Sequence, residues 1–88
     1  MNDFNLLMEF LENNLLADNL IADAAKKLGI SDYHLKRTFI FVAGISLSEY
    51  IKTRRLVLAN EELAGGAPVT DVAFKYGYNS VEGFSRAF

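Results

Sequence analysis

The chain has 88 residues and is 51% hydrophobic, enough for the core of one small domain, and its lack of cysteine excludes disulfides and thiolate metal sites. Its apolar runs are only a few residues long and no basic leader precedes them, so we expect a cytoplasmic protein without a signal peptide or membrane span. The net charge of −2 is segregated, because residues 1–25 carry five acidic residues and no basic one, whereas residues 26–55 carry seven basic and two acidic residues.

This segregation gives the middle of the chain the basic surface that a nucleic-acid binder needs. The alternative is an ordinary solvated helical surface whose charges are distributed unevenly.

Apolar residues spaced three and four apart predict an amphipathic helix over residues 3–16. A short helix is expected over residues 20–28, and Gly29 ends it. Ser31 is a good N-cap for a third helix over about residues 32–43.

The second half of the chain also has a helical pattern. A capping box at Ser46–Glu49 opens a long helix over about residues 47–64. Another helix is expected from Pro68, in its first turn, to Tyr76, and a last one begins after Asn79 or Ser80. No strand pattern competes, so the predicted class is all-α.

Two segments repeat one pattern 48 residues apart, at Asp23–Ser31 and at Asp71–Asn79. In each, an alanine lies four residues before a glycine, Gly29 or Gly77. The small alanine lets a second helix cross close to the first, and the glycine adopts the left-handed conformation that reverses the chain. Two such helix-turn-helix units indicate a long, repetitive ligand such as duplex DNA. The alternative is a plain helical bundle whose long helix is its spine.

With these two units, the sequence resembles the DNA-binding domain of the AraC/XylS family of bacterial transcription regulators, over about residues 5–88. Four segments carry the resemblance most specifically: Ser31–Phe39, Gly44–Ile51 followed by Arg54, Arg55, Leu56 and Ala59, Asp71–Ala73 with Gly77 and Tyr78, and Phe84–Phe88.

The resemblance implies a monomeric, homeodomain-like fold of seven helices. A first helix-turn-helix subdomain over residues 1–45 and an incomplete second one over residues 66–88 are joined by a linker helix over residues 46–65. Its partner is double-stranded promoter DNA, with the recognition helices in adjacent major grooves. RNA polymerase is a candidate partner, an effector domain is expected in the parent protein, and no cofactor is expected.

The resemblance also assigns the contact residues, which lie on the exposed faces of the recognition helices. The base-contacting residues are Tyr33, Lys36 and Arg37 in the first unit and Val81, Glu82, Ser85 and Arg86 in the second. The expected contacts to the DNA backbone come from Ser31, His34, Lys52, Arg54, Arg55, Asn79 and Ser80.

Helical geometry agrees with the first set of contacts. Leu35 and Phe39 lie four residues apart on a core-facing side, so Tyr33, Lys36 and Arg37 point away from the core. An arginine at this position can bind guanine O6 and N7 together. The alternative for Arg37 is a surface ion pair with Asp32 or another carboxylate. On the linker helix, one of the three basic residues can instead pair with Glu49 or Glu62.

The second reading surface is the poorer one. Phosphate repels Glu82, which can however accept a hydrogen bond from cytosine N4, and Gly83 costs a helix about 1 kcal/mol relative to alanine. We therefore expect the first unit to supply most of the specificity and the second to add phosphate contacts and shape recognition.

The sequence departs from the family pattern in three ways. Apolar residues 40–42 stand where the family has charged ones, and they indicate either a wider buried stripe that reaches the first helix or a docking patch for another domain. The chain ends where the family continues the last recognition helix and adds a final packing helix, so we expect a fragment whose Phe84 and Phe88 lose cover and whose last residues fray. An effector domain is absent from the sequence.

No catalytic pattern stands out. His34 has neither a cysteine nor a second histidine to complete a metal site, and Glu61 and Glu62 form a solvated helical face. We therefore do not expect an enzyme. The competing hypothesis is a helical protein-interaction module that has kept the fold and lost DNA binding.

Overall fold

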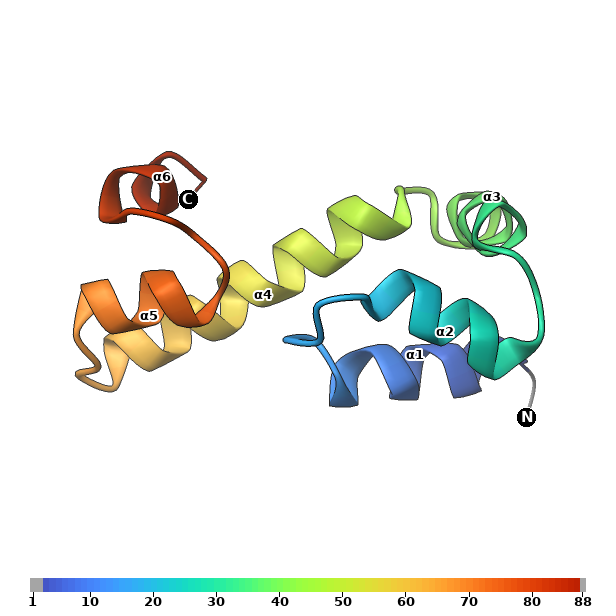
Figure 1. Ribbon diagram of the computed structural model, residues 1–88, viewed down its shortest axis with the longest axis horizontal. Coiled ribbons are helices and arrows are strands. Elements are labelled where there is room, and N and C mark those ends of the chain that lie inside the picture. Colours follow the sequence, from blue (N-terminus) through green and yellow to red (C-terminus); the bar gives the residue numbers. More distant parts are fainter. Residues whose placement is uncertain (1–2, 88) are drawn as a thin grey trace. The chain divides into compact units, whose positions relative to one another are not determined.

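The computed structural model describes residues 3–87, and over that range it contains helices and no strands, which confirms the all-α class (Figure 1). The helices are α1 (Asp3–Asn13), α2 (Leu20–Leu28), α3 (Asp32–Ala43), α4 (Leu47–Ala64), α5 (Val69–Lys75) and α6 (Val81–Ala87). None of the helices in this range has the length and apolar character needed to cross a membrane.

The chain divides into two compact units, which we call unit 1 (Met1–Ile51) and unit 2 (Lys52–Phe88). Unit 1 holds α1, α2, α3 and the first turn of α4, and unit 2 holds the rest of α4 with α5 and α6. Each unit is therefore described by itself.

In unit 1, α1 and α2 pack side by side, and α3 follows α2 after a short turn (Figure 1). Leu35 and Phe39 are the buried residues of α3, as the sequence predicted. The ring of Phe39 stacks on Phe4 at 6.0 Å and contacts Tyr50 at 5.5 Å, so one side chain joins α3 to α1 and to α4. The rest of this core consists of Leu7, Leu11, Leu15, Leu20, Ala24, Ala25, Leu47 and Ile51.

The turn between α2 and α3 has the geometry that the glycine predicted. Gly29 has a φ of 72°, in the left-handed region, and the amide of Ile30 donates to the carbonyl of Ala25 at 3.0 Å. Ala25 is fully buried, which fits its predicted role as the small residue where two helices approach closely.

Unit 2 repeats this turn. Gly77 has a φ of 92°, and the amide of Tyr78 donates to the carbonyl of Ala73 at 3.0 Å. Ala73 is fully buried and packs with Val72 and Phe84 in a second core, which also contains Ala59 and Tyr76. The internal repeat of the sequence is thus a repeat of backbone structure, with Ala25 and Ala73 accepting equivalent hydrogen bonds.

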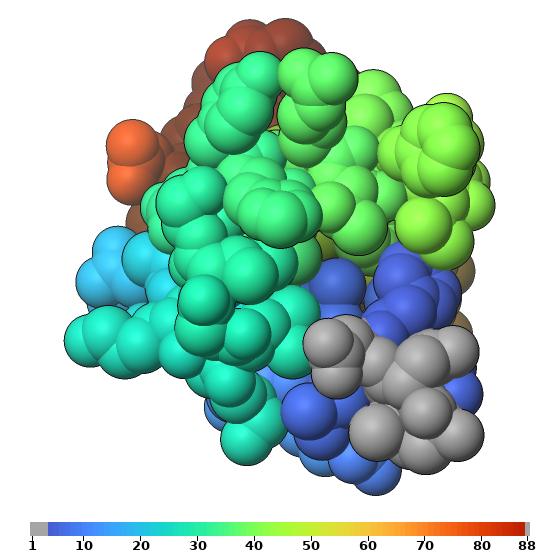
Figure 2. All heavy atoms as spheres, turned by 90° about the vertical axis from the view of Figure 1, so that its right-hand side faces the viewer, coloured from blue at the N-terminus to red at the C-terminus, as the bar shows by residue number. Residues whose placement is uncertain are grey.

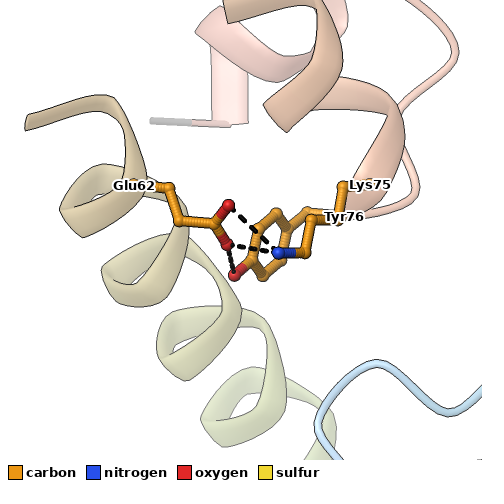
Figure 3. Close-up of polar contacts among 3 residues, drawn as sticks. All are labelled: Glu62, Lys75 and Tyr76. Carbon is orange, nitrogen blue, oxygen red and sulfur yellow. Dashed lines mark hydrogen bonds and ion pairs between the residues drawn. The ribbon is translucent and has the colours of Figure 1, made fainter. Parts of the chain in front are cut away.

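A polar cluster joins α4 to the end of α5 within unit 2 (Figure 3). The carboxylate of Glu62 accepts hydrogen bonds from the ammonium group of Lys75, at 2.9 and 3.0 Å, and from the hydroxyl of Tyr76. These bonds lower the pKa of Glu62, the one from Tyr76 most. Burial, and then the bond to Glu62, raises the pKa of Tyr76 to about 12.

Three helix ends differ from the predicted ones, and one of them is the end of α5, which is Lys75, with Tyr76 as the C-cap. The first helix ends at Asn13 and not at residue 16, because the side chain of Asn14 donates to the carbonyl of Phe10 at 2.8 Å and the chain turns there. Leu15 is buried although it lies beyond the helix. Pro68 is the N-cap of α5, in extended conformation, so it precedes the first turn and is not part of it.

Candidate nucleic-acid interface

The α3 helix begins directly after its N-cap residue, Ser31. The hydroxyl of Ser31 accepts a hydrogen bond from the amide of His34 at 3.0 Å, and Ser31 itself is extended. The first-turn amides of α3 therefore point outward beside an exposed serine, the arrangement that favours an anion at a helix N-terminus.

The face of α3 opposite Leu35 and Phe39 is exposed and basic, as predicted. Tyr33 is 69% exposed, and Lys36 and Arg37 are also exposed. The guanidinium of Arg37 donates a hydrogen bond to the hydroxyl of Tyr33 at 3.0 Å. Arg37 thus contacts Tyr33. The ion pair with Asp32, which the sequence left open as an alternative, is not the contact seen.

A hollow of about 390 Å³ lies between this face of α3 and the first turn of α4. It is lined by Tyr33, Lys36, Arg37, Ile40, Ser46, Leu47 and Ser48, all within unit 1. Figure 2 shows the end of unit 1 where α3, in green, presents its side chains. The predicted base-contacting residues of the first unit therefore share one concave surface.

The apolar residues 40–42 do not form the wider buried stripe that was one expectation, so that interpretation is wrong. Ile40 is 49% exposed, Phe41 89% and Val42 54%. Successive positions on a helix lie about 100° apart, and Leu35 and Phe39 already fill the side that packs on the core. Val42 alone approaches α1, where it lines a hollow with Phe4 and Leu7.

In unit 2, α6 has the same kind of start as α3. The hydroxyl of Ser80 accepts a hydrogen bond from the amide of Gly83 at 3.0 Å, so Ser80 and not Asn79 is the cap. Phe84 is buried and its ring packs edge to face with Tyr78 at 5.3 Å, so the expectation that Phe84 loses cover is wrong. Phe88, the other aromatic residue that the sequence predicted to lose cover, lies outside the described residues.

The predicted contact residues of unit 2 lie on α4, on α6 and in the turn that precedes α6. On α6, Glu82, Ser85 and Arg86 are exposed and Val81 is half-buried. On α4, Lys52 is exposed, whereas Arg54 and Arg55 are half-buried. Asn79 is exposed and Ser80 half-buried in the preceding turn. Glu62, offered as a partner for one of the basic residues of α4, binds Lys75 and Tyr76.

Sequence reasoning missed Ile40 as a member of the exposed α3 face. The residue follows Tyr33, Lys36 and Arg37 at the spacing i, i+3, i+4, i+7, which places all four on one side of a helix. That spacing was a sufficient signal, but because residue 40 is apolar it was interpreted as a packing residue.

Comparison with known proteins shows the family of the chain. A family model described as a helix-turn-helix domain matches residues 24–88. The regulatory protein SoxS of Salmonella typhimurium is 40% identical over 83 residues, which are 93% of this chain and 78% of SoxS. The transcriptional activator AarP of Providencia stuartii is 34% identical over 83 residues, 93% of this chain and 62% of AarP.

The right origin-binding protein of Escherichia coli is 36% identical over 83 residues, 93% of this chain and 29% of that protein. The chain thus spans between 29% and 78% of the length of these three curated relatives.

Proposed function

Since this chain belongs to the helix-turn-helix family of AraC/XylS type, we propose that it binds double-stranded DNA sequence-specifically in bacterial transcription regulation, with α3 and α6 as its recognition helices. The observation that carries the proposal is the exposed face of α3, where Tyr33, Lys36 and Arg37 line one hollow. A helix-turn-helix places such a face in the major groove.

Arg37 is the principal reader in this proposal. Its guanidinium can donate two parallel hydrogen bonds to guanine O6 and N7, a pairing worth about 1–3 kcal/mol of discrimination. The bond from Arg37 to the Tyr33 hydroxyl holds the guanidinium on the exposed side of α3, so less side-chain entropy is lost on binding. Lys36 reaches a neighbouring guanine or phosphate.

Phosphate contacts position the two helices on the duplex. In unit 1 we assign them to Ser31 and His34, at the start of α3. In unit 2 the candidates are Lys52, Arg54 and Arg55 on α4, and Asn79 and Ser80 before α6.

The long helix supports a two-groove mode of binding. With 18 residues, α4 is about 27 Å long. Adjacent major grooves on one side of B-DNA are about 34 Å apart, and we propose that the two recognition helices enter such a pair of grooves. We propose residues 46–65 as the linker between a first subdomain at residues 1–45 and a second at residues 66–88.

The two recognition helices contribute unequally in this proposal. The exposed side chains of α6 include Glu82, which phosphate repels, beside Ser85 and Arg86. We therefore assign most of the base discrimination to α3.

The test begins with selection of a duplex from a randomised pool, followed by fluorescence anisotropy at two salt concentrations. The dissociation constant should rise steeply with salt, because each neutralised phosphate releases counterions. Arg37→Ala should weaken binding by about 5–150-fold, the equivalent of about 1–3 kcal/mol, and Arg86→Ala by much less. Lys26→Ala removes the same charge from the exposed side of α2 and is the matched control.

Salt-independent binding, or none, would exclude the function. Equal losses for Arg37→Ala and Arg86→Ala would leave the function intact and exclude the asymmetry.

The second candidate function is a protein-interaction module, and the exposure of Phe41 favours it. For a transcription regulator, RNA polymerase is the partner expected to bind this surface. Phe41→Lys should then abolish the protein contact and leave duplex binding in place. An unchanged protein contact in this variant would exclude residue 41 from docking.

A further inference from the structure

Ile40 is an apolar residue on a surface that is otherwise polar and basic. Half of its side chain is exposed, and it lines the same hollow as Tyr33, Lys36 and Arg37. A large aliphatic side chain left half in water on this face does not serve the core, which Leu35 and Phe39 fill from the other side of α3.

The major groove offers one apolar group to such a side chain. Thymine carries a C5-methyl group at the groove edge, whereas cytosine has only a hydrogen at C5 and adenine and guanine have no methyl group there. An isoleucine can therefore distinguish a T·A pair from a C·G pair by contact with this methyl group, without making a hydrogen bond.

The position of Ile40 relative to Arg37 suits two neighbouring base pairs. The residues lie three positions apart on α3, which is a rise of about 4.5 Å along the helix. Base pairs along one strand are about 3.4 Å apart. When Arg37 contacts a guanine, Ile40 lies within reach of the next pair or the one after it.

The neighbouring apolar residues line other hollows. Phe41 lines a second hollow with His34, Thr38, Arg37 and Ile40, and Val42 lines a third with Phe4 and Leu7. Of residues 40–42, Ile40 alone lines the hollow that holds Tyr33, Lys36 and Arg37 together.

We propose that Ile40 is a specificity-determining residue of the first recognition helix and reads a thymine through its C5-methyl group. This inference rests on the proposed DNA-binding function. Ile40 would be the fourth base-contacting residue on the α3 face, and it would act by apolar contact.

A thymine-to-uracil series on the selected duplex tests the proposal, because uracil lacks only the methyl group. We expect one or two thymines at which uracil weakens binding by the full chain about 3–5-fold, as the burial of one methyl group predicts. Ile40→Ala should weaken binding to the thymine duplex by at least a similar factor, and uracil at those positions should then have little further effect.

Val42→Ala is the matched control, since it shortens an exposed aliphatic side chain on the same helix outside this hollow. It should leave both the affinity and the sensitivity to uracil unchanged. Circular dichroism of Ile40→Ala should match that of the unaltered chain, because the side chain is half-exposed.

The outcomes separate the two proposals. If Ile40→Ala stays as sensitive to uracil at each position as the unaltered chain, Ile40 does not read a methyl group, and the inference fails while the function stands. Loss of uracil sensitivity in Tyr33→Ala but not in Ile40→Ala would assign the methyl contact to Tyr33. Absence of salt-dependent binding to any selected duplex would overturn the function, and this inference with it.

Discussion

Tyr76 and Glu62 tie α4 to α5 through side chains that titrate at opposite ends of the pH scale (Figure 3). The pKa of Tyr76 is raised to about 12, by burial first and then by its bond to Glu62. A group with a raised folded-state pKa stabilises the fold fully below its ordinary pKa of 10.0 and loses that effect as the pH rises through about 12. The pKa of Glu62 is lowered from 4.5, so its stabilising effect is present above that pH and is lost as the pH falls through the folded-state value.

We predict that Tyr76→Phe flattens both limbs of the pH dependence of the free energy of unfolding, below about pH 4.5 and between about pH 10 and 12. Urea denaturation followed by circular dichroism measures the free energy, and phenolate absorbance follows the tyrosines directly. Tyr33→Phe is the control, since Tyr33 is exposed and bonds Arg37, and it should leave both limbs in place. Unchanged limbs in Tyr76→Phe would contradict the assignment.

At the scale of single elements, the turns of the two helix-turn-helix units depend on left-handed glycines. A side-chain carbon added at Gly29 would meet no atom within 4 Å, so the penalty for a larger residue there comes from the backbone alone. Gly29→Ala should lower the free energy of unfolding by about 1–2 kcal/mol. Gly29→Asn should lose less, because asparagine tolerates this conformation.

Gly65→Ala provides the control for that prediction. Gly65 does not have a positive φ, and an added carbon would lie at an ordinary 3.5 Å from two helix carbonyls. Its effect on the free energy of unfolding should stay within about 0.5 kcal/mol. Equal losses at Gly29 and Gly65 would show that the left-handed backbone is not the cause.

Much of the element structure was predictable because it is determined locally. The caps at Ser31 and Ser46 and the left-handed Gly29 and Gly77 depend on residues within one turn, and these predictions are confirmed. The end of α1 was misjudged because Leu15 continues the apolar spacing and reaches the core from the turn beyond the helix.

The candidate site was only partly predictable. The exposure of Tyr33, Lys36 and Arg37 follows from helix spacing alone. Outside the site, the bonds from Lys75 and Tyr76 to Glu62 join α4 to the end of α5 across 13 and 14 positions, and no local rule specifies such a pairing. The roles of Tyr33, Lys36 and Arg37 in DNA contact remain predictions.

At the scale of the whole molecule, each unit has a core of its own. Phe39 is the central aromatic residue of unit 1, and Phe84 of unit 2. Removing either ring by substitution with alanine should cost about 3–5 kcal/mol, a large part of the stability of a small domain. We predict that Phe84→Ala removes amide-exchange protection from α5 and α6, while α1, α2 and α3 keep theirs.

Native-state hydrogen exchange measures this, and Phe39→Ala should give the converse pattern. Uniform loss of protection across all helices in either variant would show that the two units unfold as one cooperative body.

Gly83 limits how the protein can be engineered. Exchanging a helical glycine for alanine is a standard route to a more stable domain. Here the new methyl group would lie 3.3 Å from the hydroxyl of Ser80, the atom that starts α6. A stabilisation campaign on this chain can therefore gain from residue 83 only if the Ser80 hydroxyl, which caps the same helix, shifts by a few tenths of an ångström.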